Sequence, residues 1–127
     1  MNKPKICLCV HDDVLQPLKW ILYEFNKDLS VTTFKSATKF ETACQFNEWD
    51  LLILDAAASE DTMTSCLQKI RSLKPAIKIT LIVPPVANRD EVVEIIKSNM
   101  VQGLVIKPFS AEIICKYLAK ELSVPVN

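Results

Sequence analysis

Three short segments of the sequence carry the side chains that could do chemistry. Each follows an apolar run: His11-Asp12-Asp13, Asp55 and Lys107-Pro108. If these runs are parallel strands of one sheet, the three segments meet at its carboxyl edge, where open α/β sheets bind ligands. Clustered carboxylates suit Mg²⁺, which takes a few oxygens together with waters and substrate phosphate. A lysine complements phosphoryl oxygens, and the central aspartate could then be a nucleophile that forms an acyl phosphate.

A purely structural interpretation of the same residues stays open. Acidic residues after a strand often cap the next helix, and Asp13 is placed to do only that. Lys107 could simply pair with a carboxylate. Asp55, however, follows four apolar residues and precedes three alanines, which disfavours a solvated position on the surface.

Five apolar runs predict the elements that would position these residues. Four runs are nearly continuous in apolar residues, as in strands covered on both faces, and the second alternates in polarity like an edge strand. The runs are Lys5–Val10, Leu29–Phe34, Asp50–Leu54, Ile77–Val83 and Gly103–Ile106. A segment with helical spacing follows each run. The sequence therefore predicts an α/β fold, a doubly wound five-stranded parallel sheet with helices on both faces.

Local signals predict where some helices begin and which aromatic residues are buried. Thr38 with Glu41, and Asn88 with Glu91, have the spacing of a capping box at a helix start. Pro17 is expected in the first turn of the first helix, because further inside it would break the hydrogen-bond ladder. The two tryptophans, Trp20 and Trp49, are expected in the core or at its edge.

The length and composition of the chain exclude several classes of function. The 127 residues are enough for one domain, and we expect a single domain with its core at about residues 4–122 and no output domain. The chain has 15 Lys+Arg and 15 Asp+Glu, and this zero net charge argues against nucleic-acid or anionic-membrane binding. A single glycine excludes the GxGxxG and GxxxxGK[ST] nucleotide-binding loops.

The cysteines and apolar segments indicate the compartment. The five cysteines are odd in number and lie in apolar segments, so they are interpreted as buried thiols in a reducing environment rather than as disulfides. No apolar run approaches the roughly 20 residues of a membrane span, and Ile6–Val10 is too short for a signal-peptide core. We expect a cytoplasmic protein.

Over essentially its whole length the chain resembles a response-regulator receiver domain of two-component signal transduction. The resemblance rests on ICLCVHDD, LLILD and GLVIKPFS at the family's spacing. It implies a flavodoxin-like fold with strand order 2-1-3-4-5, in which Asp55 accepts a phosphoryl group from a sensor histidine kinase or phosphotransfer protein. It also implies Mg²⁺ held by Asp12, Asp55 and the Ala57 carbonyl, Lys107 on the phosphoryl oxygens, and a cis peptide before Pro108.

Several residues depart from the family pattern near the site. His11 takes the first of two acidic positions, which lowers the expected Mg²⁺ affinity, and Asp13 compensates only in part. Pro85 replaces the hydroxyl residue after the fourth strand, and Leu104 replaces the aromatic switch residue. We therefore predict weak or slow phosphorylation and little rearrangement of the surface formed by the fourth helix, fifth strand and fifth helix.

That surface is expected to bind a downstream protein partner. The stripe Val92–Ile96 is interpreted mainly as core, with Val86, Met100 and Leu104 around it as a possible apolar docking patch. Asn99 stands beside the position of a usual glycine and is able to take a left-handed conformation.

Two functions remain from these observations. The leading hypothesis is a receiver in a phosphorelay, with enzymatic activity limited to Mg²⁺-dependent self-phosphorylation and dephosphorylation at Asp55. The alternative is a pseudo-receiver, an interaction module that signals without phosphoryl transfer. The retained acids and Lys107 favour the first, whereas His11, Pro85 and Leu104 favour the second.

Overall fold

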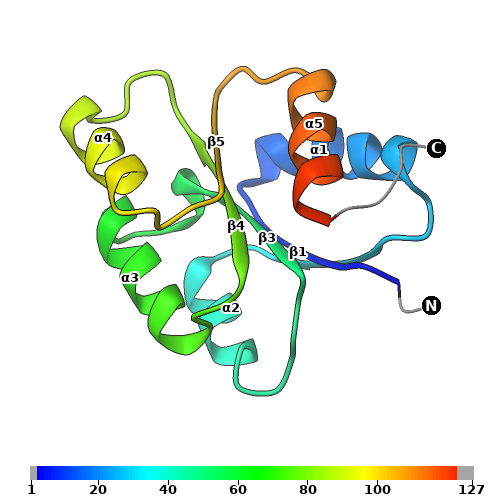
Figure 1. The fold of residues 1–127 in the computed structure, drawn as a ribbon, viewed down its shortest axis with the longest axis horizontal. Helices are drawn as coiled ribbons and strands as arrows, with labels where there is room; N and C mark the ends of the chain where they lie inside the picture. Colours follow the sequence, from blue (N-terminus) through cyan, green and yellow to red (C-terminus); the bar gives the residue numbers. More distant parts are fainter. Residues whose placement is uncertain (1–2, 123–127) are drawn as a thin grey trace.

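The chain folds around a five-stranded parallel sheet with the order β2-β1-β3-β4-β5, which confirms the predicted topology (Figure 1). The computed structural model describes residues 3–122. The strands are β1 (Lys5–Cys9), β2 (Ser30–Phe34), β3 (Leu51–Asp55), β4 (Lys78–Val83) and β5 (Gly103–Ile106). The helices are α1 (Asp12–Phe25), α2 (Ala37–Ala43), α3 (Met63–Leu73), α4 (Arg89–Lys97) and α5 (Ala111–Leu122), with the 3-10 turn η1 (Ala56–Ala58) after β3.

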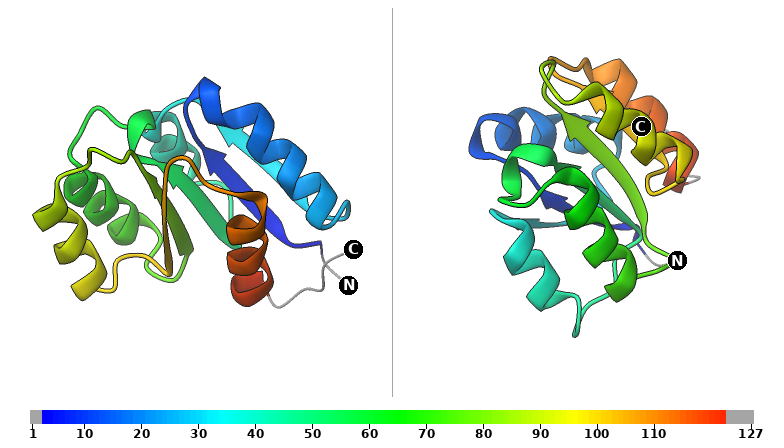
Figure 2. Two further views of the ribbon diagram at one scale, coloured as in Figure 1. Left: turned by 90° about the horizontal axis from the view of Figure 1, so that it is seen from above. Right: turned by 90° about the vertical axis from the view of Figure 1, so that its left-hand side faces the viewer.

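Helices cover both faces of the sheet and form two core layers (Figure 2). In β3, Leu52 and Leu54 pack with buried residues of α2, α3 and α4. Their neighbours Leu51 and Ile53 pack with α1 and α5 on the opposite face. All four side chains are at most 1% exposed. Burial on both faces explains why this strand is a continuous apolar run rather than an alternating one.

The first residue of α4 agrees with the prediction from the sequence, whereas that of α2 does not. Asn88 caps α4, and its side-chain oxygen accepts a hydrogen bond from the Glu91 backbone N–H at 2.9 Å. Helix α2 begins after Ser36, so the prediction of a start at Thr38 is wrong. The Ser36 hydroxyl accepts from the Lys39 N–H at 3.3 Å. The earlier start also places Ala37 in the core, 5% exposed, which favours it over the exposed Thr38.

Pro17 lies inside α1 and not in its first turn, so that prediction is also wrong. It is the sixth residue of the helix and cannot donate the backbone hydrogen bond to the Asp13 carbonyl. The ring is exposed, and a buried apolar stripe on the other side holds the helix against the sheet. Even α1, at 14 residues, is short, and within residues 3–122 no helix has the length and apolar character to cross a membrane.

The two tryptophans have different environments. Trp49 packs on Phe34 and Phe40, with ring centroids 5.8 and 5.4 Å away, at the edge of the core as predicted. Trp20 is 66% exposed, which contradicts its predicted burial. The buried stripe of α1 runs through Leu18 and Ile21, and at 100° per residue it leaves Trp20 on the outer side of the helix.

The connection between α4 and β5 needs one left-handed residue. Asn99 has φ 54°, as its predicted role requires. Its N–H donates to the Ile96 carbonyl at 3.2 Å, and the next residue, Met100, donates to Ile95 at 3.4 Å. The chain thereby leaves α4 and turns back into β5.

Candidate functional site

Asp55 is the last residue of β3 and pairs in register with Ile82 of β4. Its side chain is completely buried, as expected from the apolar run before it. Strand β3 is central, so Asp55 lies between the chain that leaves β1 and the chain that leaves β4. A carboxylate at this place needs donors within the protein, because burial of an unpaired charge is very costly.

Three donors surround the Asp55 carboxylate. Oδ2 accepts hydrogen bonds from the His11 backbone N–H and from Lys107 Nζ, each at 3.2 Å. Oδ1 accepts from the Ala57 backbone N–H at 3.0 Å. The donors follow β1, β3 and β5, so the carboxyl ends of three strands build the site together. Charge-assisted hydrogen bonds of this kind are the strong ones.

The Lys107 ammonium also faces a second carboxylate. Asp13 Oδ2 lies 3.9 Å from Lys107 Nζ, and Asp13 Oδ1 lies 2.8 Å from His11 Nδ1. The hydrogen bond with His11 and the charge of Lys107 lower the pKa of Asp13, although some loss of solvation opposes them. His11 acts as the N-cap of α1. His11, Asp13, Lys107 and Asp55 are therefore neighbours in one polar network.

Asp12 is the predicted site residue that does not join this network. It is exposed at the start of α1 and makes no hydrogen bond or ion pair within residues 3–122. In the same part of the chain no three His, Cys, Asp or Glu side chains are arranged to hold a metal ion. The predicted Mg²⁺ donors are thus divided: Asp55 and Ala57 lie together at the end of β3, whereas Asp12 is exposed at the start of α1. Carboxylate and carbonyl oxygens are the donors that Mg²⁺ takes together with several waters, and His11 stands where the family pattern has a further carboxylate.

Solved structures share this architecture. No protein-family model matches the sequence, and no curated protein matches it either. A response regulator receiver domain protein from Methanospirillum hungatei has a TM-score of 0.82 at 17% identity, over 96% of this chain and 95% of that one. The signal receiver domain of an HD domain-containing protein from Pseudomonas fluorescens has 0.82 at 19%, over 96% of both. A two-component response regulator from Clostridium difficile has 0.80 at 22%, over 95% and 97%. The chain has the receiver-domain fold.

Within the receiver fold, Pro85 lies beside Lys107 at the rim of the site. A groove of about 460 Å³ is lined by Asp13, Val14, Pro17, Pro85, Lys107, Pro108 and Phe109. The Lys107–Pro108 peptide is cis, and the Lys107 backbone N–H donates to the Val83 carbonyl at 2.9 Å. Proline carries neither a hydroxyl nor an N–H. Pro85 therefore adds no hydrogen-bond donor next to the Asp55 carboxylate.

Leu104 is held in place by α5. It is half-buried against the core, and its carbonyl accepts from the Tyr117 hydroxyl at 3.4 Å. A Cβ on Gly103 would lie 2.8 Å from the Tyr117 ring and 3.3 Å from Thr80 Oγ1. Only glycine allows this close approach of α5 to β5. Sequence reasoning missed Tyr117, and the signal that could have found it is the position of the one glycine, directly before Leu104.

The stripe Val92–Ile96 is core only in part. Ile95 is completely buried, whereas Val93 is 39% and Ile96 is 54% exposed. Helix α4 lies at the margin of the molecule (Figure 1), and Ile95 is its one buried residue. Of the patch suggested around the stripe, Val86 is exposed, but Met100 and Leu104 pack against the core.

Proposed function

We propose that the chain is a receiver of a two-component phosphorelay and that Asp55 is its phosphoryl acceptor. The observation that carries the proposal is the Asp55 carboxylate at the carboxyl end of the central strand, with Lys107 Nζ 3.2 Å away. A buried carboxylate with one adjacent ammonium is the pair that phosphoryl transfer to an acid requires: a nucleophile, and a cation for the phosphoryl oxygens.

The phosphoryl donor is a phosphohistidine on a sensor histidine kinase or phosphotransfer protein. An Asp55 oxygen attacks phosphorus, the P–N bond breaks, and the leaving imidazole keeps the electron pair and takes a proton from water. Lys107 moves its ammonium from the carboxylate to the oxygens of the new aspartyl phosphate. The backbone N–H groups of His11 and Ala57 orient the carboxylate before attack.

Mg²⁺ is the cofactor that this chemistry requires. Asp12, Asp55 and the Ala57 carbonyl would hold it, and when bound it would neutralise charge on the phosphoryl oxygens. We expect weak binding, because His11 supplies no carboxylate and ligand charge tunes affinity for hard cations.

Transfer should be slow for a second reason. The Asp55 side chain is 0% exposed, and both of its oxygens already accept hydrogen bonds. Attack requires Lys107 to shift and the rim of the groove to open. Pro84 and Pro85 stiffen one part of that rim, since proline fixes φ.

A downstream protein partner is expected on the face formed by α4, β5 and α5. Five large apolar side chains of this face and the loop before it are between 39% and 89% exposed: Val86, Val93, Ile96, Ile106 and Ile113. Exposed apolar groups gathered in one region mark interaction sites. With Leu104 and Pro85 at the switch positions, we expect this face to change little on phosphorylation.

A second function, a pseudo-receiver that binds partners without phosphoryl transfer, has specific support. His11, Pro85 and Leu104 stand at three of the positions on which the family's chemistry and switching depend. The same exposed apolar face would serve this function without any change at Asp55.

The decisive experiment is intact-mass analysis after incubation with acetyl phosphate and Mg²⁺, with an acid quench. We expect slow gain of one phosphoryl group, and no gain in Asp55→Asn. Folded protein that gains no mass and binds no Mg²⁺ in calorimetry would contradict the proposal and favour the pseudo-receiver. Rapid stoichiometric uptake would contradict the predicted slowness alone.

A further inference from the structure

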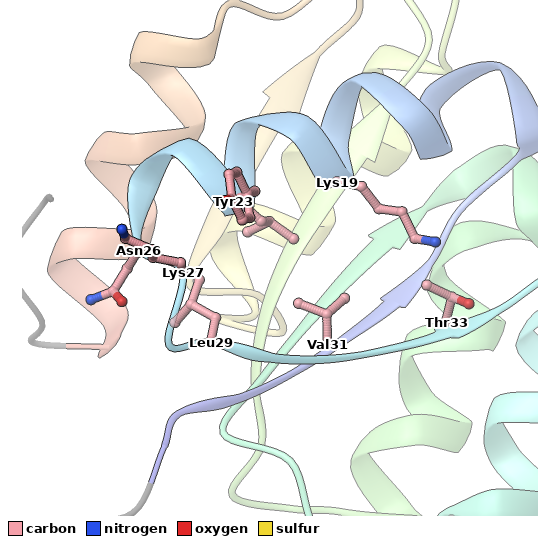
Figure 3. A pocket seen from close by; sticks show the side chains of 8 residues that line it. Lys19, Tyr23, Asn26, Lys27, Leu29, Val31 and Thr33 are labelled. Carbon is pink, nitrogen blue, oxygen red and sulfur yellow. The ribbon is translucent and has the colours of Figure 1, made fainter.

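A groove of about 360 Å³ lies between α1 and the edge strand β2, away from Asp55 (Figure 3). Helix α1 and the turn after it contribute Lys19, Leu22, Tyr23, Asn26 and Lys27. The other side is formed by Leu29, which directly precedes β2, and by Val31 and Thr33 of the strand. The groove is therefore bounded by a helix on one side and by the last strand of the sheet on the other.

Positive charge lies at the two ends of this groove. Lys19 reaches toward Thr33 at one end, and Lys27 extends beside Asn26 at the other (Figure 3). No carboxylate lines the groove, and neither lysine forms an ion pair within the described part of the chain, residues 3–122. The groove thus complements an anionic occupant at both ends.

The middle of the groove is apolar and open. Tyr23 is 60% exposed and Val31 is 38% exposed. Trp20, 66% exposed, stands next to Tyr23 with 6.5 Å between ring centroids. Aromatic groups left in solvent beside a groove are typical anchors for a partner's side chain.

Strand β2 has one unpaired edge. It pairs only with β1, and the Ser30 N–H donates to the Pro4 carbonyl on that side at 2.9 Å. Because backbone groups alternate along a strand, the N–H and C=O groups of Val31 and Thr33 point away from the sheet. Ser30–Phe34 contains no proline and no charged residue, the usual devices that protect an edge.

We propose that the groove binds an acidic segment of a partner protein, which adds to the edge of β2 as a strand. From Leu29 to Thr33 the groove spans five residues, and the four steps between them cover about 13 Å at the rise of a strand. On an added strand, side chains four residues apart lie on one face with a third midway between them. The segment is therefore acid-x-apolar-x-acid, with its carboxylates at Lys19 and Lys27 and its apolar side chain on Tyr23 and Val31.

A second copy of this chain is a poor occupant. Pairing of two β2 edges would bring the lysines of one copy toward those of the other, and like charges in apposition oppose association. The inference also does not depend on phosphoryl transfer. The groove shares no residue with the contacts of Asp55, so loss of Asp55 chemistry leaves it intact.

The test is fluorescence anisotropy of a labelled heptapeptide, Ser-Glu-Thr-Val-Thr-Glu-Ser, titrated with the full chain. We expect Lys19→Glu/Lys27→Glu to weaken binding by about tenfold or more. The matched control, Lys116→Glu/Lys120→Glu, makes the same charge change on exposed positions of α5 and should bind within about twofold of the parent. Asp55→Asn should bind unchanged. Equal losses in the two lysine variants would overturn the proposal.

Two N-methylated peptides test strand addition without altering the protein. One carries the methyl group on the Val nitrogen and the other on the next Thr nitrogen, so the two modified nitrogens point to opposite edges of the added strand. We expect only one of them to lose binding. If both bind like the parent peptide, no strand is added and the proposal is wrong. A dimer of the free chain in sedimentation, abolished by Lys19→Glu/Lys27→Glu, would overturn it in favour of self-association.

Discussion

Lys107 Nζ lies 3.2 Å from Asp55 Oδ2, although the two residues are 52 positions apart in the chain. Asp55 is completely buried and Lys107 is about one-fifth exposed, so the ammonium connects an interior charge to the surface. A second carboxylate, Asp13, lies 3.9 Å from the same nitrogen. The Lys107 ammonium therefore lies between a buried carboxylate and an exposed one.

Lys107→Met should destabilise the protein as well as slow phosphorylation. The substitution leaves a buried carboxylate with only its two backbone donors, and we expect unfolding free energy to fall by about 2 kcal/mol. Urea unfolding of the parent and the variant measures the loss. Lys116→Met, an exposed lysine of α5, is the matched control and should change stability little.

A double-mutant cycle separates this pair from general effects. Asp55→Asn removes the charge that Lys107 neutralises, so Lys107→Met should cost less in that background than in the parent. Equal costs in both backgrounds would mean that the 3.2 Å contact contributes no coupling energy.

His11→Asp should strengthen Mg²⁺ binding on the order of tenfold, because it supplies the missing carboxylate next to Asp12. Aspartate is also a good helix N-cap, so α1 should keep its start. Calorimetric titration with Mg²⁺ at neutral pH measures the gain. His11→Ala is the control, since it removes the imidazole without adding a charge. If alanine strengthens binding as much as aspartate, the added ligand is not the cause.

The thiols should differ sharply in reactivity. Burial, followed by the neighbouring Cys66 and Asp55, raises the pKa of Cys9 to about 12, and burial raises the pKa of Cys7 well above its ordinary value. Cys115 is the only half-exposed thiol among the five. Iodoacetamide at pH 8 should therefore label Cys115 first in the native protein, as peptide mass mapping will show. Equal labelling of Cys7 would mean that the core opens readily.

The raised pKa values of Cys7 and Cys9 determine how protein stability should change with pH. In the unfolded chain these thiols ionise near 9.0, and in the folded chain they ionise at higher pH. Above pH 9 the unfolded state binds fewer protons than the folded state, so stability should fall as the pH rises. Cys9→Ala should flatten this dependence in urea unfolding between pH 8 and about 10.

Gly103→Ala should lower stability by about 1–3 kcal/mol, because the new Cβ meets the Tyr117 ring at 2.8 Å. Tyr117→Ala removes the ring and with it the clash. The double variant should therefore lose less stability than the sum of the losses in the two single variants. Thermal unfolding of the three variants measures the difference. Additive losses would place the strain elsewhere, for example at Thr80.

The sequence alone determined which segments are strands and which residues follow them. Leu51–Leu54 is apolar without interruption because both sides of β3 are covered. This pattern can be recognised in the sequence without knowing which elements pack against the strand. Asn88 and Asn99 were predictable for the same reason, since a cap and a left-handed turn depend on a few adjacent residues. The errors at Thr38, Pro17 and Trp20 arose where packing outweighed a local preference.

Only the tertiary structure decided which side chains meet. The sequence His11-Asp12-Asp13 could not show that Asp13 faces Lys107 while Asp12 stands apart, because the direction of each side chain depends on how α1 leaves β1. Nor could it show that Lys19 and Lys27 frame a groove along β2, because that juxtaposition depends on how α1 lies over the edge of the sheet. The periodicity of apolar residues can be read from the sequence, whereas the distances between side chains of different elements are set by the packing of the core.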